Sequence, residues 1–219
     1  MLHFRKIKFH KPNIRYQSSI ESFKDQFDYD RDTGIISFVQ DKQTKIPYYQ
    51  SIIGLEIHAQ LSSSTKLFTS SPTPHSNQYE PQPNSNIQPY DITYPRTLPQ
   101  LPSKSILTKT IRTCAALKSS IQIISRFERK HYFYADLPHG YQITQHRWPI
   151  AKNGSLELED TISIGIERIQ LEQDSGKTLS KDPNQSWIDF NRAGSALMEI
   201  VFCPNIQSAD IATKAVSTL

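Results

Sequence analysis

The strongest constraint on the fold is an alternation of apolar and polar residues near the start of the chain's body. Every second residue from Leu55 to Leu61 is apolar, and Glu56, His58 and Gln60 stand between them. A period of two is that of a β-strand with one buried face. On the other face an acid, an imidazole and an amide follow one another at intervals of about 7 Å. This polar face is either the wall of a site or an ordinary solvent-facing surface.

The chain is also β-rich after Arg126. Strands are expected over 131–134, 140–144, 155–159, 161–172, 186–191 and 196–202. Asn153-Gly154 predicts a hairpin turn, and the apolar phase slips near Glu167, which predicts a bulge. Apolar residues three and four apart predict a helix over 105–124, capped by Ser103 or Ser105. A second amphipathic helix begins after Ser208.

Residues 62–105 interrupt this pattern of strands and helices. Eight of the 14 prolines lie between Pro72 and Pro102, with Ser, Asn and Gln and without glycine. Such a composition predicts a long irregular loop. A loop of this length in a compact domain is uncommon, and it is either a binding loop or a degenerate one.

The positive charge of the chain is concentrated at its N-terminus. Residues 1–20 hold five Lys and Arg residues and no acid, whereas the net charge of the whole chain is +4. The body is therefore near neutral, which argues against nucleic-acid binding driven by charge alone. A basic start without acids is typical of a mitochondrial transit peptide or of a disordered tail. We expect residues 1–50 to be a transit peptide followed by a loosely structured connector.

Several classes of protein are excluded by composition. No apolar run approaches the roughly 18 residues of a membrane-spanning helix, so no membrane span is expected. The two cysteines, Cys114 and Cys203, are too few for a disulfide framework or a four-cysteine zinc site.

The candidate chemistry lies in acids on predicted strands. Besides His58, these are Glu56, Glu172, Asp174, Asp189 and Glu199. Carboxylates with one imidazole suit Mg²⁺ or Mn²⁺, and Mg²⁺ held by carboxylates commonly serves phosphate chemistry. The alternative is that these acids pair with Arg168, Lys177 and Arg192 on solvated surfaces.

Four sequence blocks resemble the B subunit of the tRNA-dependent Glu/Asp amidotransferases. GLEIHAQL at 54–61 is similar to the opening signature of the family, and YFYADLPHGYQITQ at 132–145 is similar to its Y-x-Y-P-D-L-P-x-G-Y-Q pattern. IERIQLEQDSGK at 166–177 and IDFNRAGSALMEIV at 188–201 resemble its L-E-E-D-A-G-K and D-x-N-R-x-G-x-x-L-I-E-I-V blocks. Together, in this order, the four blocks are highly specific.

The resemblance implies a fold and a reaction. The fold is α+β, a mostly antiparallel β-sheet cradle with flanking helices over 51–207. The reaction is the repair of misacylated Glu-tRNA(Gln): ATP phosphorylates the side-chain carboxylate, and ammonia then displaces the phosphate. The implied partners are the misacylated tRNA, the family's amidase subunit, which supplies the ammonia, and a small third subunit. The implied location is the mitochondrial matrix.

The resemblance also implies roles for individual residues. The positions that match metal-binding and catalytic residues of the family are Glu56, His58, Glu172 and Glu199. Those that match substrate- or ATP-binding positions are Asp174, Lys177, Asn191 and Arg192. Mg²⁺ and ATP are the implied cofactors, and no structural zinc is expected. The sequence departs from the family at Gln173, where the second acid of a pair would stand, and at Ala135, which replaces a proline.

We expect the chain to stop before the family's helical and tail domains, with residues 208–219 as the start of a truncated helix. Three hypotheses remain open at this point. The chain is the core of a mitochondrial amidotransferase, or a non-catalytic subunit that only docks the amidase, or a generic phosphotransferase. The first predicts metal-dependent ATP binding that requires His58 and Glu199, and the second predicts partner binding that survives their loss.

Overall fold

The computed structural model describes residues 27–29, 35–41, 44–74, 81–158, 162–179 and 184–219, with side chains from residue 51 onward. The predicted transit peptide at 1–20 lies outside these residues. The strands are β1 (Phe27–Tyr29), β2 (Ile35–Asp41), β3 (Thr44–Gln50), β4 (Glu56–Gln60), β5 (Ser120–Ile121), β6 (Glu128–His131), β7 (Tyr141–Thr144), β8 (Ala151–Glu157), β9 (Ser163–Gln173), β10 (Lys177–Thr178), β11 (Ile188–Asp189) and β12 (Ala196–Phe202). The helices are the 3₁₀ helix η2 (Pro89–Ile92), α1 (Lys104–Ala116) and α2 (Ala209–Thr218).

The chain forms two compact units. The first contains Ile57–Gly154 and Glu167–Ile200, and the second contains Ser155–Ile166, Val201–Leu219 and the segment that ends at Glu56. Strands and two α-helices make up the regular structure, and every strand pair for which the register is described is antiparallel. The expected α+β fold with a mostly antiparallel sheet is therefore confirmed.

The second unit includes structure that the sequence did not predict. Strands β1, β2 and β3 form an antiparallel sheet in which Phe27 pairs with Phe38 and Ile35 with Gln50. The prediction of a loosely structured connector is wrong for these strands. Because a hairpin pairs neighbouring segments through main-chain hydrogen bonds, it can form without the apolar periodicity on which that prediction depended. In the same unit α2 begins as expected, with the Ser208 side chain accepting a hydrogen bond from the Asp210 N–H.

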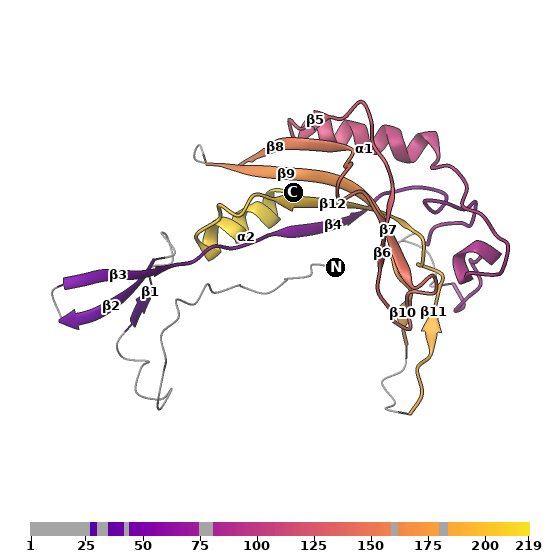
Figure 1. Ribbon diagram of the computed structural model, residues 1–219, viewed down its shortest axis with the longest axis horizontal. Coiled ribbons are helices and arrows are strands. Elements are labelled where there is room, and N and C mark those ends of the chain that lie inside the picture. Colours follow the sequence, from indigo (N-terminus) through magenta and orange to yellow (C-terminus); the bar gives the residue numbers. More distant parts are fainter. Residues whose placement is uncertain (1–26, 30–34, 42–43, 75–80, 159–161, 180–183) are drawn as a thin grey trace. The chain divides into compact units, whose positions relative to one another are not determined.

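Strands β4, β12, β9, β8 and β5 are neighbours in that order in one sheet (Figure 1), and the residues of its strands are divided between the two units. The apolar residues of β9 and β12 supply much of its core, since Ile169, Leu171 and Met198 are at most 3% exposed. Two small antiparallel sheets, β6–β7 and β10–β11, complete the first unit. Gly176 N–H donates to the Asp136 carbonyl and ties the turn after β6 to the approach of β10.

Helix α1 is shorter than predicted. Ser103 caps it by accepting from the Ile106 N–H, as expected, but the helix ends at Ala116 instead of continuing to 124. Lys118 has a left-handed φ of 52°, and Ile121 pairs with Ala151 in β5. The two serines at 119 and 120 have weak helix propensity, and pairing with β8 stabilises an extended backbone there.

The predicted hairpin turn at Asn153-Gly154 is also wrong. Both residues lie inside β8, where Asn153 has a φ of 53°. A Cβ at Gly154 would lie 2.0 Å from Ser119 Oγ, so the close approach of the α1–β5 connection requires glycine here. The Asn-Gly signal therefore marks a local backbone distortion and a close contact, not a chain reversal.

The proline-rich segment is irregular but partly buried. Lys66, Leu67 and Phe68 are at most 5% exposed, and η2 places Tyr90 and Asp91 in the interior. The segment is therefore part of the first unit's core.

Among the described residues, no helix is both long enough and apolar enough to cross a membrane.

Candidate functional site

Three neighbouring strands of the first unit bring one ionisable side chain each to a common point. His58 comes from β4, Glu199 from β12 and Glu172 from β9. His58 Nε2 lies 3.4 Å from Glu172 Oε2 and 3.8 Å from Glu199 Oε1. Adjacent strands lie about 4.8 Å apart, so side chains on the same face of three consecutive strands can meet in this way. We call these residues the His–Glu cluster.

Hydrogen bonds fix both carboxylates of the His–Glu cluster. Gln170 Nε2 lies 2.9 Å from Glu172 Oε1, 2.5 Å from Glu199 Oε2 and 2.8 Å from Thr144 Oγ1. Thr144 Oγ1 donates to Glu172 Oε1 at 2.6 Å, and Gln142 Nε2 donates to Glu172 Oε2 at 3.2 Å. Because Gln170 and Glu172 are both under 5% exposed, these neutral donors hold the acids in a fixed geometry away from bulk water.

The charges of the cluster depend on one another. Hydrogen bonds to Glu172 and then Glu199 raise the pKa of His58 to about 10, against the opposing effect of burial. Burial raises the pKa of Glu172, but hydrogen bonds, first that from His58, outweigh it and bring the pKa to about 2. The protein alone therefore holds an imidazolium beside at least one carboxylate, which means that the cluster strongly favours positive charge at its centre.

The cluster has the chemistry of a site for a hard divalent cation. One ligand atom from each of His58, Glu172 and Glu199 lies within 4.8 Å of the others. Two carboxylates and one imidazole suit Mg²⁺ or Mn²⁺. A cation bound there requires neutral His58, so the proton on the imidazole would leave as the cation enters. Gln170, Thr144 and Gln142 would then orient the ligands, as partners behind metal ligands generally do.

Glu56 is not part of the cluster. It lies two residues before His58, on the same face of β4, as the alternation predicted. The group of ligand atoms that converge among the described residues nevertheless includes only His58 and the two glutamates. The assignment of Glu56 as a metal ligand stays a prediction.

Asp174 and Arg192 form a separate ion pair just beyond the end of β9. Arg192 Nε lies 3.3 Å from Asp174 Oδ2, and the guanidinium also donates to the Ser175 and Gly176 carbonyls at 3.1 and 2.8 Å. Burial raises the pKa of Asp174, and the charge of Arg192 opposes this shift. Arg192 therefore fixes the turn between β9 and β10 as well as the charge of Asp174.

The two other predicted binding residues differ in their surroundings. Asn191 is 3% exposed, donates to the Gln82 carbonyl at 2.7 Å and accepts from the Asn86 N–H at 2.7 Å. Its amide thus anchors the proline-rich segment to the end of β11. Lys177 is exposed on β10. The binding roles of both residues stay predictions.

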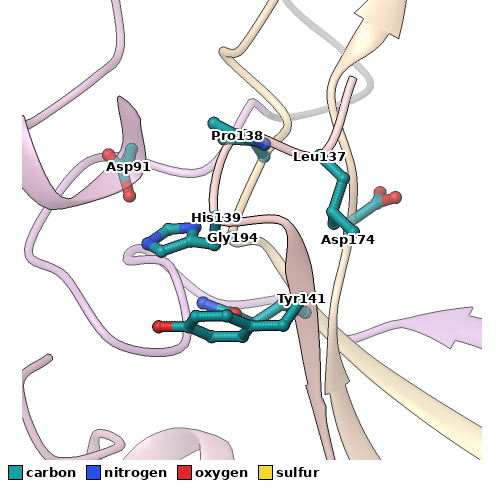
Figure 2. Close-up of a pocket in the computed structure, with 9 residues that line it drawn as sticks. Asp91, Leu137, Pro138, His139, Tyr141, Asp174 and Gly194 are labelled. Carbon is teal, nitrogen blue, oxygen red and sulfur yellow. The ribbon is translucent and has the colours of Figure 1, made fainter. Parts of the chain in front are cut away.

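Gln173 faces away from the His–Glu cluster. Successive side chains of a strand point to opposite faces, so Gln173 and Glu172 cannot serve the same ligand set. The Gln173 side chain instead lines a cavity of ≈ 10 Å³ together with Asp174 and Gly194 (Figure 2). The amide at this position therefore does not remove a carboxylate from the cluster, which was the concern that the sequence raised.

The cavity is about the size of one water molecule. Its wall includes Asp91 and His139, whose ring lies 4.7 Å from that of Tyr90 and 5.3 Å from that of Tyr141. His139 Nε2 is buried and has no hydrogen-bond partner among the described residues. Burial lowers the pKa of His139, so this imidazole is held neutral.

Behind the cavity lies a buried ion pair that the sequence did not indicate. Lys66 Nζ lies 3.2 Å from Asp91 Oδ2 and donates to the Phe190 carbonyl at 3.3 Å. Asp91 also accepts from Thr69 Oγ1 at 3.0 Å and Ser71 Oγ at 2.5 Å. Burial lowers the pKa of Lys66, although the nearby Asp91 opposes this shift. The pair joins the start of the proline-rich segment to η2 within the first unit.

Some of the residues missed by sequence analysis carried a usable signal. Gln170 precedes Glu172 by two residues on one strand, so alternation alone places both on the same face. Gln142 and Thr144 share a face of β7 in the same way. No pattern in the sequence indicated that the β7 side chains of Gln142 and Thr144 contact Glu172 of β9.

Comparison with known proteins shows which family the chain is similar to. The family described as "GatB/GatE catalytic domain" matches residues 51–219. The B subunit of the mitochondrial glutamyl-tRNA(Gln) amidotransferase of Laccaria bicolor is 46% identical over 186 residues, which are 83% of this chain and 34% of that protein. The B subunits of the aspartyl/glutamyl-tRNA(Asn/Gln) amidotransferases of Granulibacter bethesdensis and Rickettsia felis are 44% identical over 167 residues and 46% identical over 176 residues. These two matches cover 74% and 78% of this chain, and 34% and 35% of the relatives. The chain thus spans about a third of the length of the curated relatives it matches.

Proposed function

The chain belongs to the GatB/GatE catalytic-domain family, and we propose that it carries the ATP-dependent site of an amidotransferase that converts Glu-tRNA(Gln) to Gln-tRNA(Gln). The observation that carries the proposal is the His–Glu cluster, in which two buried carboxylates and one partly exposed imidazole are available to a divalent cation. The names of the relatives, which are amidotransferases of glutamyl- or aspartyl-tRNA, support the substrate class, a misacylated tRNA.

The proposed reaction has two steps. The side-chain carboxylate of the misacylated glutamate attacks the γ-phosphorus of ATP, which forms an acyl phosphate and releases ADP. Ammonia then attacks the acyl carbon, the phosphate leaves, and the amide of Gln-tRNA(Gln) remains. Phosphorylation is needed because an oxide ion is too poor a leaving group for direct amidation of a carboxylate.

The residues of the chain would perform three tasks in this reaction. His58, Glu172 and Glu199 would bind Mg²⁺, which offsets the charge of the ATP phosphates. Gln170 and Thr144 hold the two carboxylates in place, so the cluster need not reorganise when substrate arrives. The low exposure of Glu172 and Glu199 limits the water that could hydrolyse an acyl phosphate.

The proposal extends to partners and location. Ammonia would come from the amidase subunit of the complex, and a small third subunit would complete the assembly. Support for the mitochondrial matrix comes from the relative of Laccaria bicolor, whose name includes "mitochondrial", and from the basic, acid-free residues 1–20. The two other relatives described above are bacterial.

The test is Mg²⁺-dependent binding of ATP by isothermal titration calorimetry, with the full chain in complex with its amidase partner. We expect Glu199→Gln and His58→Ala to abolish the metal-dependent part of the binding. Glu167→Gln is the matched control, since Glu167 lies on the same strand as Glu172, pairs with Arg168 and is 53% exposed. An intact complex that binds no ATP would overturn the proposal and favour a subunit that only docks its amidase partner.

A further inference from the structure

An exposed aromatic pair lies at the end of the β6–β7 hairpin. Phe133 is 87% exposed and Tyr134 is 68% exposed, although both closely follow a paired strand. Large apolar side chains that stay in solvent next to a buried polar site call for a ligand that covers them. The pair sits in the first unit, as does the His–Glu cluster.

A chain of contacts links the pair to the cluster. Gln142 Nε2 donates to Glu172 Oε2 at 3.2 Å, and Tyr132 OH donates to Gln142 Oε1 at 3.0 Å. The ring of Tyr132 lies 5.5 Å from that of Tyr134 in an edge-to-face arrangement. One amide and one phenol ring therefore separate the carboxylate of Glu172 from the exposed ring of Tyr134.

The backbone that carries the exposed rings is held in place. Tyr132 N–H donates to the Gly140 carbonyl, and Leu137 N–H donates to the Tyr134 carbonyl, so the turn between the strands is closed by main-chain hydrogen bonds. Phe133 packs beside Gly140, which has a φ of 66°, and a Cβ at that glycine would lie 2.9 Å from Phe133 Cε1. A rigid ring loses little conformational freedom when a flat ligand stacks on it.

Two basic side chains of β6 lie against other aromatic rings of the same hairpin. Lys130 Nζ lies 5.7 Å from the ring centre of Tyr132, and Arg129 Cζ lies 4.6 Å from that of Tyr141. Aromatic rings interleaved with cations are the surface on which proteins stack nucleobases, with the cations near the phosphates or sugars.

We propose that Phe133 and Tyr134 form a stacking site for a nucleobase of a substrate whose phosphate or acyl end lies at the His–Glu cluster. This inference rests on the proposed function, because it assigns the base of a substrate of that same site. Two sources share this chemistry: the adenine of ATP and a base at the single-stranded 3′ end of a tRNA. In ATP a ribose and the phosphate chain separate the base from the γ-phosphorus, and in the tRNA a ribose and the aminoacyl group separate it from the reacting carboxylate. In the protein Gln142 and Tyr132 separate Glu172 from Tyr134.

The experiment measures three affinities of the full chain in complex with its amidase partner, in the presence of Mg²⁺. The probes are ATP, inorganic tripolyphosphate and the trinucleotide CCA. The variants are Phe133→Ala, Tyr134→Ala and the conservative Tyr134→Trp. Tyr94→Ala is the matched control, because Tyr94 is also 63% exposed but belongs to another loop.

We expect each alanine variant to weaken binding of one nucleobase-containing probe by about 10-fold or more, with tripolyphosphate affinity unchanged. A loss of affinity for ATP identifies adenine of the nucleotide as the stacked base. A loss of affinity for CCA identifies a base at the 3′ end of the tRNA. Tyr134→Trp should restore the affinity, and Tyr94→Ala should leave it unchanged. These readouts distinguish stacking from a structural role of the hairpin, which would also lower tripolyphosphate affinity.

Two results would overturn the inference. One is unchanged affinity of both alanine variants for ATP and CCA, which is the outcome for rings that a partner protein covers. The other is an equal loss for tripolyphosphate and ATP. The proposed function fails separately, when the wild-type complex binds neither ATP nor tripolyphosphate.

Discussion

Gln170 offers the sharpest test of how the candidate site is held together. Its amide is 3% exposed and donates toward both carboxylates of the cluster, Glu172 at 2.9 Å and Glu199 at 2.5 Å. Gln170→Met keeps the length of the side chain and removes both donors. A hydrogen bond to a charged group contributes about 1.5–3 kcal/mol, and an acceptor left unpaired in the interior adds to the loss.

We therefore expect Gln170→Met to lower the free energy of unfolding by about 3 kcal/mol. The assay is urea denaturation followed by circular dichroism, without divalent cations. For a chain of this size the urea midpoint should fall by about 1 M if the slope is about 3 kcal/mol per M. Affinity for Mn²⁺, measured separately, should fall about 10- to 100-fold, because orienting partners of metal ligands have effects of this size.

The control is Gln100→Met, which makes the same chemical change at an exposed residue whose main-chain N–H donates to the Phe68 carbonyl. A loss for Gln170→Met no greater than that of the control would refute the reasoning. It would mean that the two carboxylates reorganise around His58 and do not need the amide. An unchanged Mn²⁺ affinity with a large loss of stability would limit the role of Gln170 to folding.

Three further predictions concern the interior of the protein. Lys66→Met leaves the buried Asp91 charge uncompensated and should cost about 3–5 kcal/mol in urea denaturation, whereas the double variant with Asp91→Asn should recover part of this. Gly194→Ala should cost about 1–2 kcal/mol in the same assay, because its φ is 82°; an unchanged midpoint would contradict this. Burial raises the pKa of Cys114 to about 11, so a thiol reagent at pH 8 should label the partly exposed Cys203 first and Cys114 only on unfolding.

Some features of the site were predictable because they depend on one strand alone. The alternation around His58 identified β4 and its polar face, and the same rule placed Gln170 and Glu172 on one face of β9. The four sequence blocks indicated the family. Predictions failed where a tertiary contact opposed the periodicity of a single segment. The apolar periodicity predicted that the helix continues past Ala116, but Ile121 pairs with Ala151 in an extended backbone, so the helix ends early.

The sequence by itself determined which residues can act, because the residue types and the two-residue period are properties of the chain. Only the tertiary structure decided which of them act together. His58, Glu199 and Glu172 meet because β12 lies between β4 and β9, an order that local sequence does not specify. The same packing places Asp174 with Arg192 and uses Asn191 to anchor the proline-rich segment. Strand order is fixed by burial of the whole sheet, so it cannot be derived from any one of these segments.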